Sequence, residues 1–402
     1  MTATFDPWSA EFVAHPYDAY AELREHAPVS RYEPTGQWLV SRHQDVSVLL
    51  RDRRLGRTYT HRHTHEEFGQ PAPDPAHEPF HTLNDHGLLD LEAPDHTRIR
   101  RLVSKAFTPR MVEGLRPTVT RLADELVGGL LADGGGDLIA AVAEPLPVAV
   151  IAEMLGVPEA DRGLLRPWSA AITGMFELNP GEETARRAVT ASIEFSDYLR
   201  ALIRERRTRP GTDLISALIQ AQEGSDALSE QEMVSTCVLL LNAGHEATVN
   251  TTGNGWWALF RNPDQLDLLR GSVDELLPTA VEELMRYDTP LQMFERWVLE
   301  DIEVAGVSIP RGSEVALLFG SANRDPARFT APDRLDLARA DNPHITFGAG
   351  IHFCLGAPLA RLELAASYGA LLRRAPGLRL VREPEWQPGY VIRGLKELLV
   401  EV

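Results

Sequence analysis

One helical segment places the strongest constraint on how this chain can fold. Residues 229–232 read Ser-Glu-Gln-Glu, a capping box that starts a helix, and periodic apolar residues continue from there to about Phe260. A helix of roughly 30 residues is about 45 Å long. It is mostly apolar from Met233 to Leu241, so we expect the helix at 229–260 to run through the core of a mainly α protein.

The middle of this helix contains residue types that a buried helix ordinarily avoids, namely Asn242, Gly244, His245, Glu246 and Thr248. A buried polar group costs free energy unless it is paired. Departures from local rules of this kind concentrate at functional sites. The segment therefore predicts that a functional site lies against the helix.

The rest of the chain is mostly helical, with a minor β portion and no repeat or linker that would divide it. Residues 17–27 predict a helix, and residues 28–32 and 37–41 predict a hairpin. Further strands are expected at 297–299, 304–309 and 314–319 and near the C-terminus. Residues 61–90, rich in His, Pro, Asp and Glu, predict a long loop that covers a pocket. We expect residues 1–402 to form one large domain.

Composition excludes several classes of function. The chain has 40 basic and 58 acidic residues, a formal charge of −18, which would repel nucleic acid. Its most apolar stretch, 138–155, is interrupted by prolines and glutamates and cannot span a bilayer as an unbroken helix. Residues 1–16 lack a signal-peptide pattern, and the two cysteines, Cys237 and Cys354, are far apart. These features predict a cytoplasmic protein.

The second strong feature is the glycine-rich segment 347–361, which reads FGAGIHFCLGAPLAR. Its glycines allow a tight loop and the close approach of a bulky partner. A helical pattern begins just after Cys354, so the N–H groups at the helix start are expected to stabilise its thiolate. Zinc would need about four ligands, and a cysteine hydrolase would need His352 or His344 as its base. A haem needs only one thiolate and a flat apolar pocket, so ligand number favours haem.

Three motifs resemble those of the cytochromes P-450. The loop from Phe347 to Gly356 matches the cysteine-ligand loop of the family, and Glu283-Leu-Met-Arg286 matches its Glu-x-x-Arg pair. Residues 243–248, Ala-Gly-His-Glu-Ala-Thr, match the motif of its central helix. The similarity extends from about residue 7 to the C-terminus and is greatest to soluble actinobacterial members that act on secondary metabolites. It implies the family's fold, mainly α with a minor β portion, in which the long helix crosses a haem.

The resemblance implies a haem b whose iron is bound by the Cys354 thiolate. It assigns the haem propionates to His96, Arg100, Arg296 and His352, which meets the need of buried carboxylates for cationic partners. Further cofactor contacts are implied at Phe347, Gly348, Gly356, Ala243 and Gly244. Glu283 and Arg286 are expected to be a buried structural pair, tied to Arg328 or its neighbours.

The catalytic segment departs from the family pattern at one position. The family has an acid followed by an alcohol, whereas here Glu246 is followed by Ala247, and Thr248 comes one residue later. One residue rotates a side chain by about 100° around a helix, so Thr248 is not expected to replace the missing hydroxyl. We expect these three residues to form the catalytic segment, with a hydroxyl of the substrate completing the proton relay.

The implied reaction inserts one oxygen atom from O2 into a bulky, mostly apolar organic substrate, such as a hydroxylated polyketide or macrolide. The expected pocket residues are largely apolar: Leu240, Ala243, Ala247, Leu291, Gln292, Met293, Phe294, Val391 and Ile392. Electrons would reach a monomeric enzyme from a ferredoxin and its reductase. The candidate docking residues are Arg98, Arg101, Lys105 and Arg110.

Other interpretations stay open on the sequence alone. They are oxidative coupling or desaturation in place of hydroxylation, a non-catalytic haem-binding sensor, and a cysteine hydrolase. His61, His63 and His65 form a histidine-rich stretch that could bind a metal.

Overall fold

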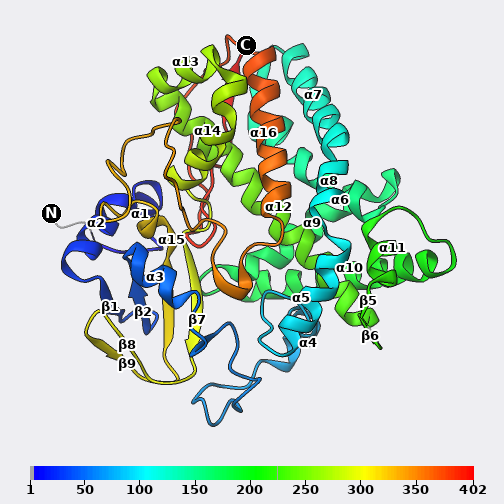
Figure 1. The fold of residues 1–402 in the computed structure, drawn as a ribbon, viewed down its shortest axis with the longest axis vertical. Coiled ribbons are helices and arrows are strands. Elements are labelled where there is room, and N and C mark those ends of the chain that lie inside the picture. The colour runs from blue at the N-terminus through cyan, green and yellow to red at the C-terminus, as the bar shows by residue number, and fades with distance from the viewer. Residues whose placement is uncertain (1–3, 224) are drawn as a thin grey trace.

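Helices form most of the molecule, and β1, β2, β7, β8 and β9 lie together at one side of it (Figure 1). The computed structural model describes residues 4–223 and 225–402. The helices of eight or more residues are α2 (Tyr17–His26), α4 (Glu78–Asp85), α5 (Asp95–Ala106), α7 (Arg116–Ala132), α8 (Pro145–Leu155), α9 (Leu165–Thr173), α10 (Glu182–Thr208), α12 (Glu230–Arg261), α13 (Pro263–Gly271), α14 (Val273–Tyr287) and α16 (Ala357–Arg374). Shorter helices are α1 (Ala10–Ala14), α3 (His43–Leu49), α6 (Pro109–Gly114), α11 (Leu214–Gln220) and α15 (Phe319–Ala322).

The long helix α12 lies at the centre of the helical region (Figure 1). It has 32 residues and begins with the expected capping box, in which Ser229 and Glu232 each accept a hydrogen bond from the other's backbone N–H. It packs against α8, α9, α10, α14 and α16, and Met233 to Val238 are buried. The helix therefore crosses the core, as its apolar half predicts.

The main sheet has five strands and is covered on both faces. In spatial order they are β1 (Val29–Tyr32), β2 (Gln37–Val40), β10 (Glu314–Leu318), β7 (Met293–Val298) and β3 (Leu55–Gly56). Neighbours are antiparallel, except that β2 and β10 are parallel. Because successive side chains alternate between faces, Val315 and Leu317 enter one apolar cluster, and Ala316 and Leu318 enter another.

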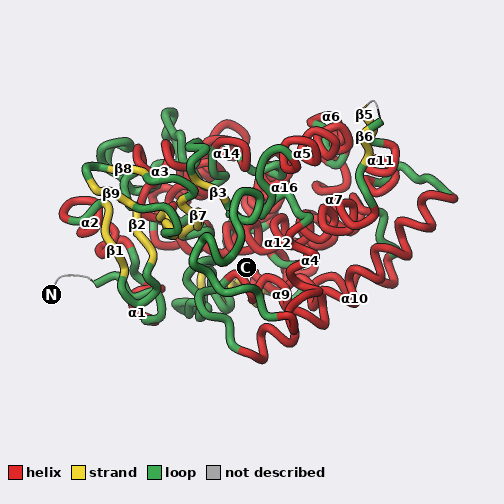
Figure 2. Tube along the Cα trace, turned by 90° about the horizontal axis from the view of Figure 1, so that it is seen from below, coloured by secondary structure: helices red, strands yellow, loops and turns green. Residues whose placement is uncertain are grey.

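Three small sheets complete the β portion. They are β11 (Arg379–Leu380) with β12 (Leu399–Glu401) and β4 (Gly135–Asp137), β5 (Gln222–Glu223) with β6 (Asp226–Ala227), and β8 (Ile302–Val304) with β9 (Val307–Ile309). Strand β4 contains the glycine run before Asp137. The pairing with β12 needs glycine at position 135, because a Cβ there would lie 2.3 Å from the carbonyl oxygen of Val400. Seen from below, the main sheet and the far end of α10 lie at opposite ends of the molecule (Figure 2).

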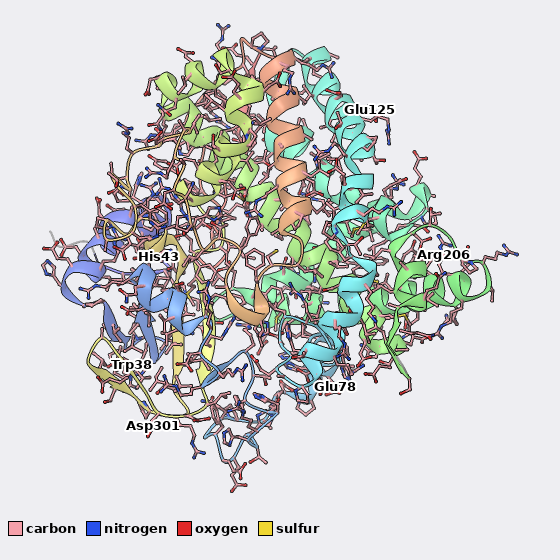
Figure 3. The ribbon with its side chains drawn as sticks, in the orientation of Figure 1. Trp38, His43, Glu78, Glu125, Arg206 and Asp301 are labelled. Carbon is pink, nitrogen blue, oxygen red and sulfur yellow. The ribbon has the colours of Figure 1, made fainter. Side chains whose placement is uncertain are left out.

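Residues 61–90 are more ordered than the predicted loop. A turn near Phe68, whose ring stacks on Tyr59 at 4.2 Å, is followed by the single turn η1 (Pro75–His77) and by α4. Phe80 and Leu83 of α4 are buried, and this helix packs against α10 and α12. Few apolar residues mark α4 in the sequence, so periodicity did not indicate it. Glu78 at its start and Arg206 near the end of α10 lie at the periphery (Figure 3).

The apolar stretch 138–155 is divided between a π-helical turn, η2 (Ile139–Ala143), and α8. Across the two described ranges, no helix is both long and apolar enough to cross a membrane.

Candidate active site

Cys354 lies between a short turn, η5 (Gly350–His352), and the start of α16. Its backbone N–H donates to the carbonyl oxygen of Phe347 at 2.9 Å, which closes the loop. Gly350 has a φ of 72°, and a Cβ there would lie 2.5 Å from the carbonyl oxygen of Leu50. The loop therefore needs this glycine, and it leaves the cysteine side chain half-buried.

The Cys354 thiol lacks the low pKa that its position before a helix predicts. Burial raises its pKa, and this outweighs the lowering by the backbone N–H groups of Gly356 and Ala357 and by the guanidinium groups of Arg100 and Arg361. The helix start does act on the sulfur as expected, but burial dominates. A metal cation at the sulfur would supply the missing positive charge.

The four predicted propionate ligands form a cluster of cationic side chains beside this loop. The rings of His96 and His352 lie 4.5 Å apart, and His352 Nε2 lies 3.2 Å from a carboxylate oxygen of Glu92. Arg100 donates to the carbonyl oxygen of Phe353 at 2.7 Å. His96 and Arg296 are each 2% exposed. Among the described residues, both ring nitrogens of His96 and Nη2 of Arg296 have no hydrogen-bond partner.

The buried nitrogens of this cluster are not satisfied by the described residues. Burial, with His352 and Arg100 nearby, lowers the pKa of His96 to about 4. Burial and the neighbouring Arg57 lower the pKa of Arg296 to about 9. Buried donors without acceptors call for a ligand that accepts hydrogen bonds. The two carboxylates of a haem fit this requirement, so the residues present fit the group.

One face of α12 is accessible even though the helix crosses the core. Ala243 is exposed, and Leu240, Gly244 and Ala247 are half-buried, whereas the neighbouring Leu241 is buried. Positions i, i+3, i+4 and i+7 share one face of a helix. Leu240, Ala243 and Ala247 therefore share one accessible face of α12, whereas a Cβ at Gly244 would lie 2.7 Å from Ile151 of α8.

Thr248 points away from that face, as the rotation of one residue predicts. It is buried, and its hydroxyl hydrogen-bonds with the carboxyl of Glu363 in α16. Burial raises the pKa of Glu363 to about 8, although the Thr248 hydroxyl offsets part of the rise. Glu363 was missed from the sequence because a single acid in a helix beside Arg361 is typical of a solvated surface. Burial also raises the pKa of Glu246, with Glu144 adding to the rise.

Glu283 and Arg286 of α14 form the expected buried ion pair, with Arg286 Nε 2.7 Å from Glu283 Oε2 and both side chains fully buried. The prediction that Arg328 joins this pair is wrong. Arg339 Nε donates to Glu283 at 3.0 Å, whereas Arg328 pairs with Asp341 at 2.9 Å. The segment after β10 reaches the ion pair at Arg339, which lies further along the chain than Arg328. Arg286 also donates to the carbonyl oxygens of Asn323 and Pro332, each at 2.8 Å.

A second ion pair, which the motifs did not indicate, braces the cysteine loop from the neighbouring helix. Burial would raise the pKa of Glu282, but hydrogen bonds from Arg361 and His344 lower it to about 2. The guanidinium of Arg361 also lies 4.6 Å from the ring centre of Phe347. His344 and His352, the bases considered for a cysteine hydrolase, are thus each hydrogen-bonded to a carboxylate.

The predicted pocket residues outside α12 divide into two groups. Leu291, Phe294 and Ile392 are half-buried, and Val391 is 8% exposed beside them. Gln292 and Met293 differ from the expectation, since they are 0% and 1% exposed and lie in the core. Alternation along β7 turns Met293 to the opposite face from Phe294, and Gln292 accepts a hydrogen bond from the Tyr20 hydroxyl at 2.8 Å.

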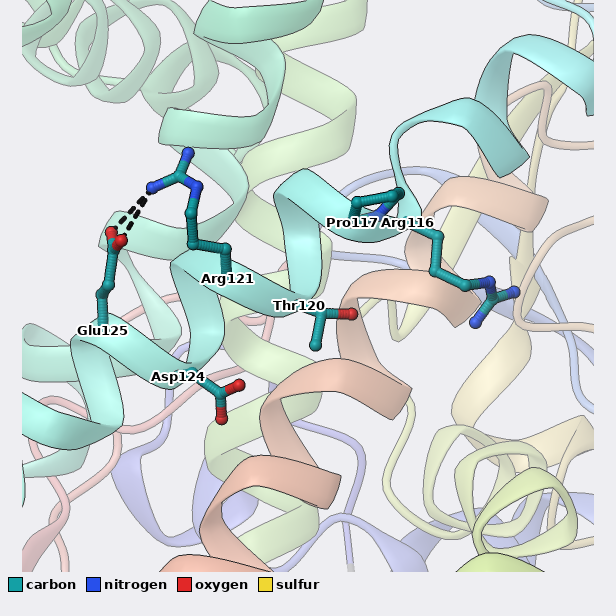
Figure 4. Close-up of a pocket in the computed structure, with 6 residues that line it drawn as sticks. All are labelled: Arg116, Pro117, Thr120, Arg121, Asp124 and Glu125. Atoms are coloured by element: carbon teal, nitrogen blue, oxygen red, sulfur yellow. Dashed lines mark hydrogen bonds and ion pairs between the residues drawn. The ribbon is translucent and has the colours of Figure 1, made fainter.

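Two other features show no link to this site. In the described part of the chain, no group of three or more His, Cys, Asp or Glu residues is placed to hold a metal, and His65 hydrogen-bonds to Tyr59 at 2.7 Å. A surface groove of about 670 Å³ on α7 is drawn in Figure 4. Its lining includes the paired Arg121 and Glu125 and no predicted site residue.

Comparison with known proteins identifies relatives along almost the whole chain. The family model described as Cytochrome P-450 matches residues 175–375. The chain is 41% identical to the cytochrome P-450 monooxygenase PikC of Streptomyces venezuelae, with 96% of this chain and 91% of PikC covered. It is 39% identical to 6-deoxyerythronolide B hydroxylase of Saccharopolyspora erythraea, with 100% of both covered. The solved structure of PksS, the cytochrome P-450 of the Bacillus subtilis bacillaene polyketide synthase, matches with a TM-score of 0.90, 37% identity and 99% of both chains.

Proposed function

The chain belongs to the cytochrome P-450 family and is a haem-dependent monooxygenase, and from this premise we propose which of its residues perform the reaction. Cys354 supplies the axial thiolate, and His96, Arg100, Arg296 and His352 bind the propionates. The observation that carries this assignment is the set of buried nitrogens on His96 and Arg296 that lack hydrogen-bond partners in the described residues. Phe347, Gly348, Gly356, Ala243 and Gly244 would form the remaining contacts with the haem.

A haem held by the Cys354 thiolate would supply dioxygen activation, so that one oxygen atom of O2 enters a substrate C–H bond and the other leaves as water with two electrons and two protons from outside. The chain's own part is to orient the substrate and to deliver protons. Burial raises the pKa of Glu246 and raises that of Glu363 to about 8, so the Glu363 carboxyl can hold a proton at neutral pH. Thr248 holds the Glu363 carboxyl in place. Ala247 leaves the accessible face of α12 without a hydroxyl, so the substrate supplies one.

The substrate we propose is a hydroxylated polyketide or macrolide. Leu240, Ala243, Leu291 and Ile392 offer it an apolar surface. One relative is named as the polyketide biosynthesis cytochrome P-450 PksS, and another is named as a hydroxylase of 6-deoxyerythronolide B. A hydroxyl on such a molecule can approach the helix at Ala247.

Electrons are proposed to come from a ferredoxin and its reductase in the cytoplasm, where both cysteines remain free thiols. Ile351 and Phe353 of the cysteine loop are exposed by 51% and 43%, which supports docking of a protein beside the loop. Of the predicted docking residues, Lys105 and Arg110 are exposed and suit an acidic partner. Arg98 and Arg101 are less suitable than expected, because they pair with Glu232 and Asp226.

Incubation with ferredoxin, its reductase, NADPH and isotopically labelled dioxygen tests this proposal on a panel of polyketides, macrolides, steroids and terpenoids. We expect substrate-dependent NADPH consumption and one labelled oxygen atom in the product from a hydroxylated macrolide or polyketide. A desaturated or coupled product without labelled oxygen would contradict it. Bound haem without substrate-dependent NADPH consumption would instead indicate a sensor.

A further inference from the structure

An acid lies among the cationic side chains that are proposed to bind the haem carboxylates. Glu92 precedes α5, and its Oε1 accepts hydrogen bonds from the backbone N–H of Arg57 at 2.7 Å and from Nε2 of His352 at 3.2 Å. The side chains of Glu92 and His352 are only 10% and 8% exposed. A buried carboxylate is costly unless it is hydrogen-bonded, and beside a site for two other carboxylates it also adds repulsion. The hydrogen bonds of Glu92 must therefore be strong enough to hold an anion at this place.

Glu92 joins three segments that each contribute to the cationic cluster. Its carboxylate contacts Arg57, which follows β3, and His352, which ends η5. Its backbone carbonyl oxygen accepts a hydrogen bond from the N–H of His96 in α5 at 2.9 Å. At Gly56 a Cβ would lie 3.4 Å from Glu92 Oε1, so β3 packs closely against the carboxylate. The acid is therefore fixed where these segments meet.

The charge of Glu92 determines how it interacts with the His352 ring. Burial would raise the pKa of Glu92, but the hydrogen bonds from His352 and Arg57 and the nearby charge of Arg296 lower it below its ordinary value. The ionised carboxylate can only accept hydrogen bonds, so Nε2 of His352 is the donor. The described residues contain no other hydrogen-bond partner for this ring. Since a cationic imidazole donates from both nitrogens, Nδ1 is left for a second acceptor.

We propose that Glu92 is a positioning residue of the haem site, which holds the His352 ring so that its second nitrogen is available to a haem carboxylate. This role rests on the proposed function, because it is there that His352 is assigned to that carboxylate. Without Glu92, the His352 side chain would lose its one hydrogen-bond partner among the described residues. Binding of the haem carboxylate would then also have to order the ring, which weakens binding.

The rate at which haem transfers from the loaded protein to apomyoglobin tests this role in a double-mutant cycle. Glu92→Gln keeps the side-chain volume and removes the charge, and His352→Phe keeps a ring without nitrogens. We expect haem to leave Glu92→Gln about fivefold faster than the original protein, because a charge-assisted hydrogen bond becomes a neutral one. In the His352→Phe background, the same change should alter the rate by less than about twofold. Glu92→Leu, which also removes the acceptor, should accelerate haem loss further and again only when His352 is present.

Asp90→Asn is the matched control. It removes an equal charge two residues earlier, where the carboxylate pairs with the guanidinium of Arg57 at 3.0 Å. We expect its effect on haem loss to be the same with and without His352. An effect of Asp90→Asn that disappears in the His352→Phe background would overturn the proposal, because any nearby charge would then serve as well as Glu92.

The remaining outcomes separate positioning from simpler roles. Unchanged or slower haem loss in Glu92→Gln would overturn the proposal, because the acid would then at most repel the haem carboxylates. Equal acceleration in both backgrounds would overturn it too, since Glu92 would then brace the fold without acting through His352. An unchanged rate in His352→Phe alone would contradict the assignment of His352 in the proposed function, and with it the role of Glu92. Faster loss in His352→Phe with an unchanged rate in Glu92→Gln would refute only the role of Glu92.

Discussion

At the scale of single residues, Ala247 is where the chemistry of the site departs most from what a proton relay needs. It lies on the accessible face of α12 and carries no hydroxyl, while Thr248 is buried against Glu363. A hydroxyl on the substrate would occupy the space beside the Ala247 methyl group. The identity of this one side chain therefore links the relay to the choice of substrate.

Ala247→Thr tests this link on the hydroxylated substrate. A threonine hydroxyl would compete with the substrate hydroxyl for the same space, so we expect product formed per NADPH consumed to stay equal or fall, by up to about tenfold. On an analogue that lacks the hydroxyl, the variant should gain coupling. A large gain in coupling and turnover on the hydroxylated substrate would show that the relay does not use the substrate's hydroxyl.

At the scale of elements, three strands of the main sheet bring two acids together, and one of them, Glu314, has a raised pKa. Gln37 Nε2 in β2 donates to Glu295 in β7 at 2.7 Å and to Glu314 in β10 at 2.9 Å. Burial, with the charge of Glu295, raises the pKa of Glu314 to about 7. The folded protein therefore retains a proton at Glu314 that the unfolded chain has lost above its ordinary pKa of 4.5. It follows that this group lowers stability as pH rises from about 4.5 to about 7.

Glu314→Gln should remove this dependence. At pH 8 we expect the variant to unfold at a higher temperature than the original protein, by about 1 kcal/mol or a few degrees, because it no longer buries a charge. At pH 4.5 the two proteins should unfold at similar temperatures. Glu303→Gln, an exposed position on β8, is the control. A stability difference that is the same at both pH values would mean that ionisation of Glu314 is not its cause.

The distance along the chain between a residue and its partners explains which site residues the sequence could predict. The capping box of α12, the loop around Cys354 and the Glu283–Arg286 pair depend on partners within a few residues, so short motifs reveal them. Glu92, Glu363 and Arg339 depend on partners more than fifty residues away in the chain, and each reads alone as an ordinary surface charge. Met293 lies in a strand, β7, that is covered on both faces, and such a strand shows no alternation that would identify the pocket side.

At the scale of the whole molecule, the charge of −18 hides a small cationic cluster on which the account depends. His96, Arg100, Arg296 and His352 come from three separated segments, and the fold brings them together beside Cys354. The accessible face of α12 supplies the apolar residues of the same site. The helices α12, α14 and α16, of which α16 begins just after Cys354, pack against one another.

The carbon monoxide difference spectrum of the reduced protein tests the central claim most directly. We predict the red-shifted band of a haem bound by thiolate, its loss in Cys354→Ser, and its persistence in Cys237→Ser, because Cys237 is fully buried in α12. Absence of the band from the original protein, or its persistence in Cys354→Ser, would contradict the assignment of Cys354 as the haem ligand.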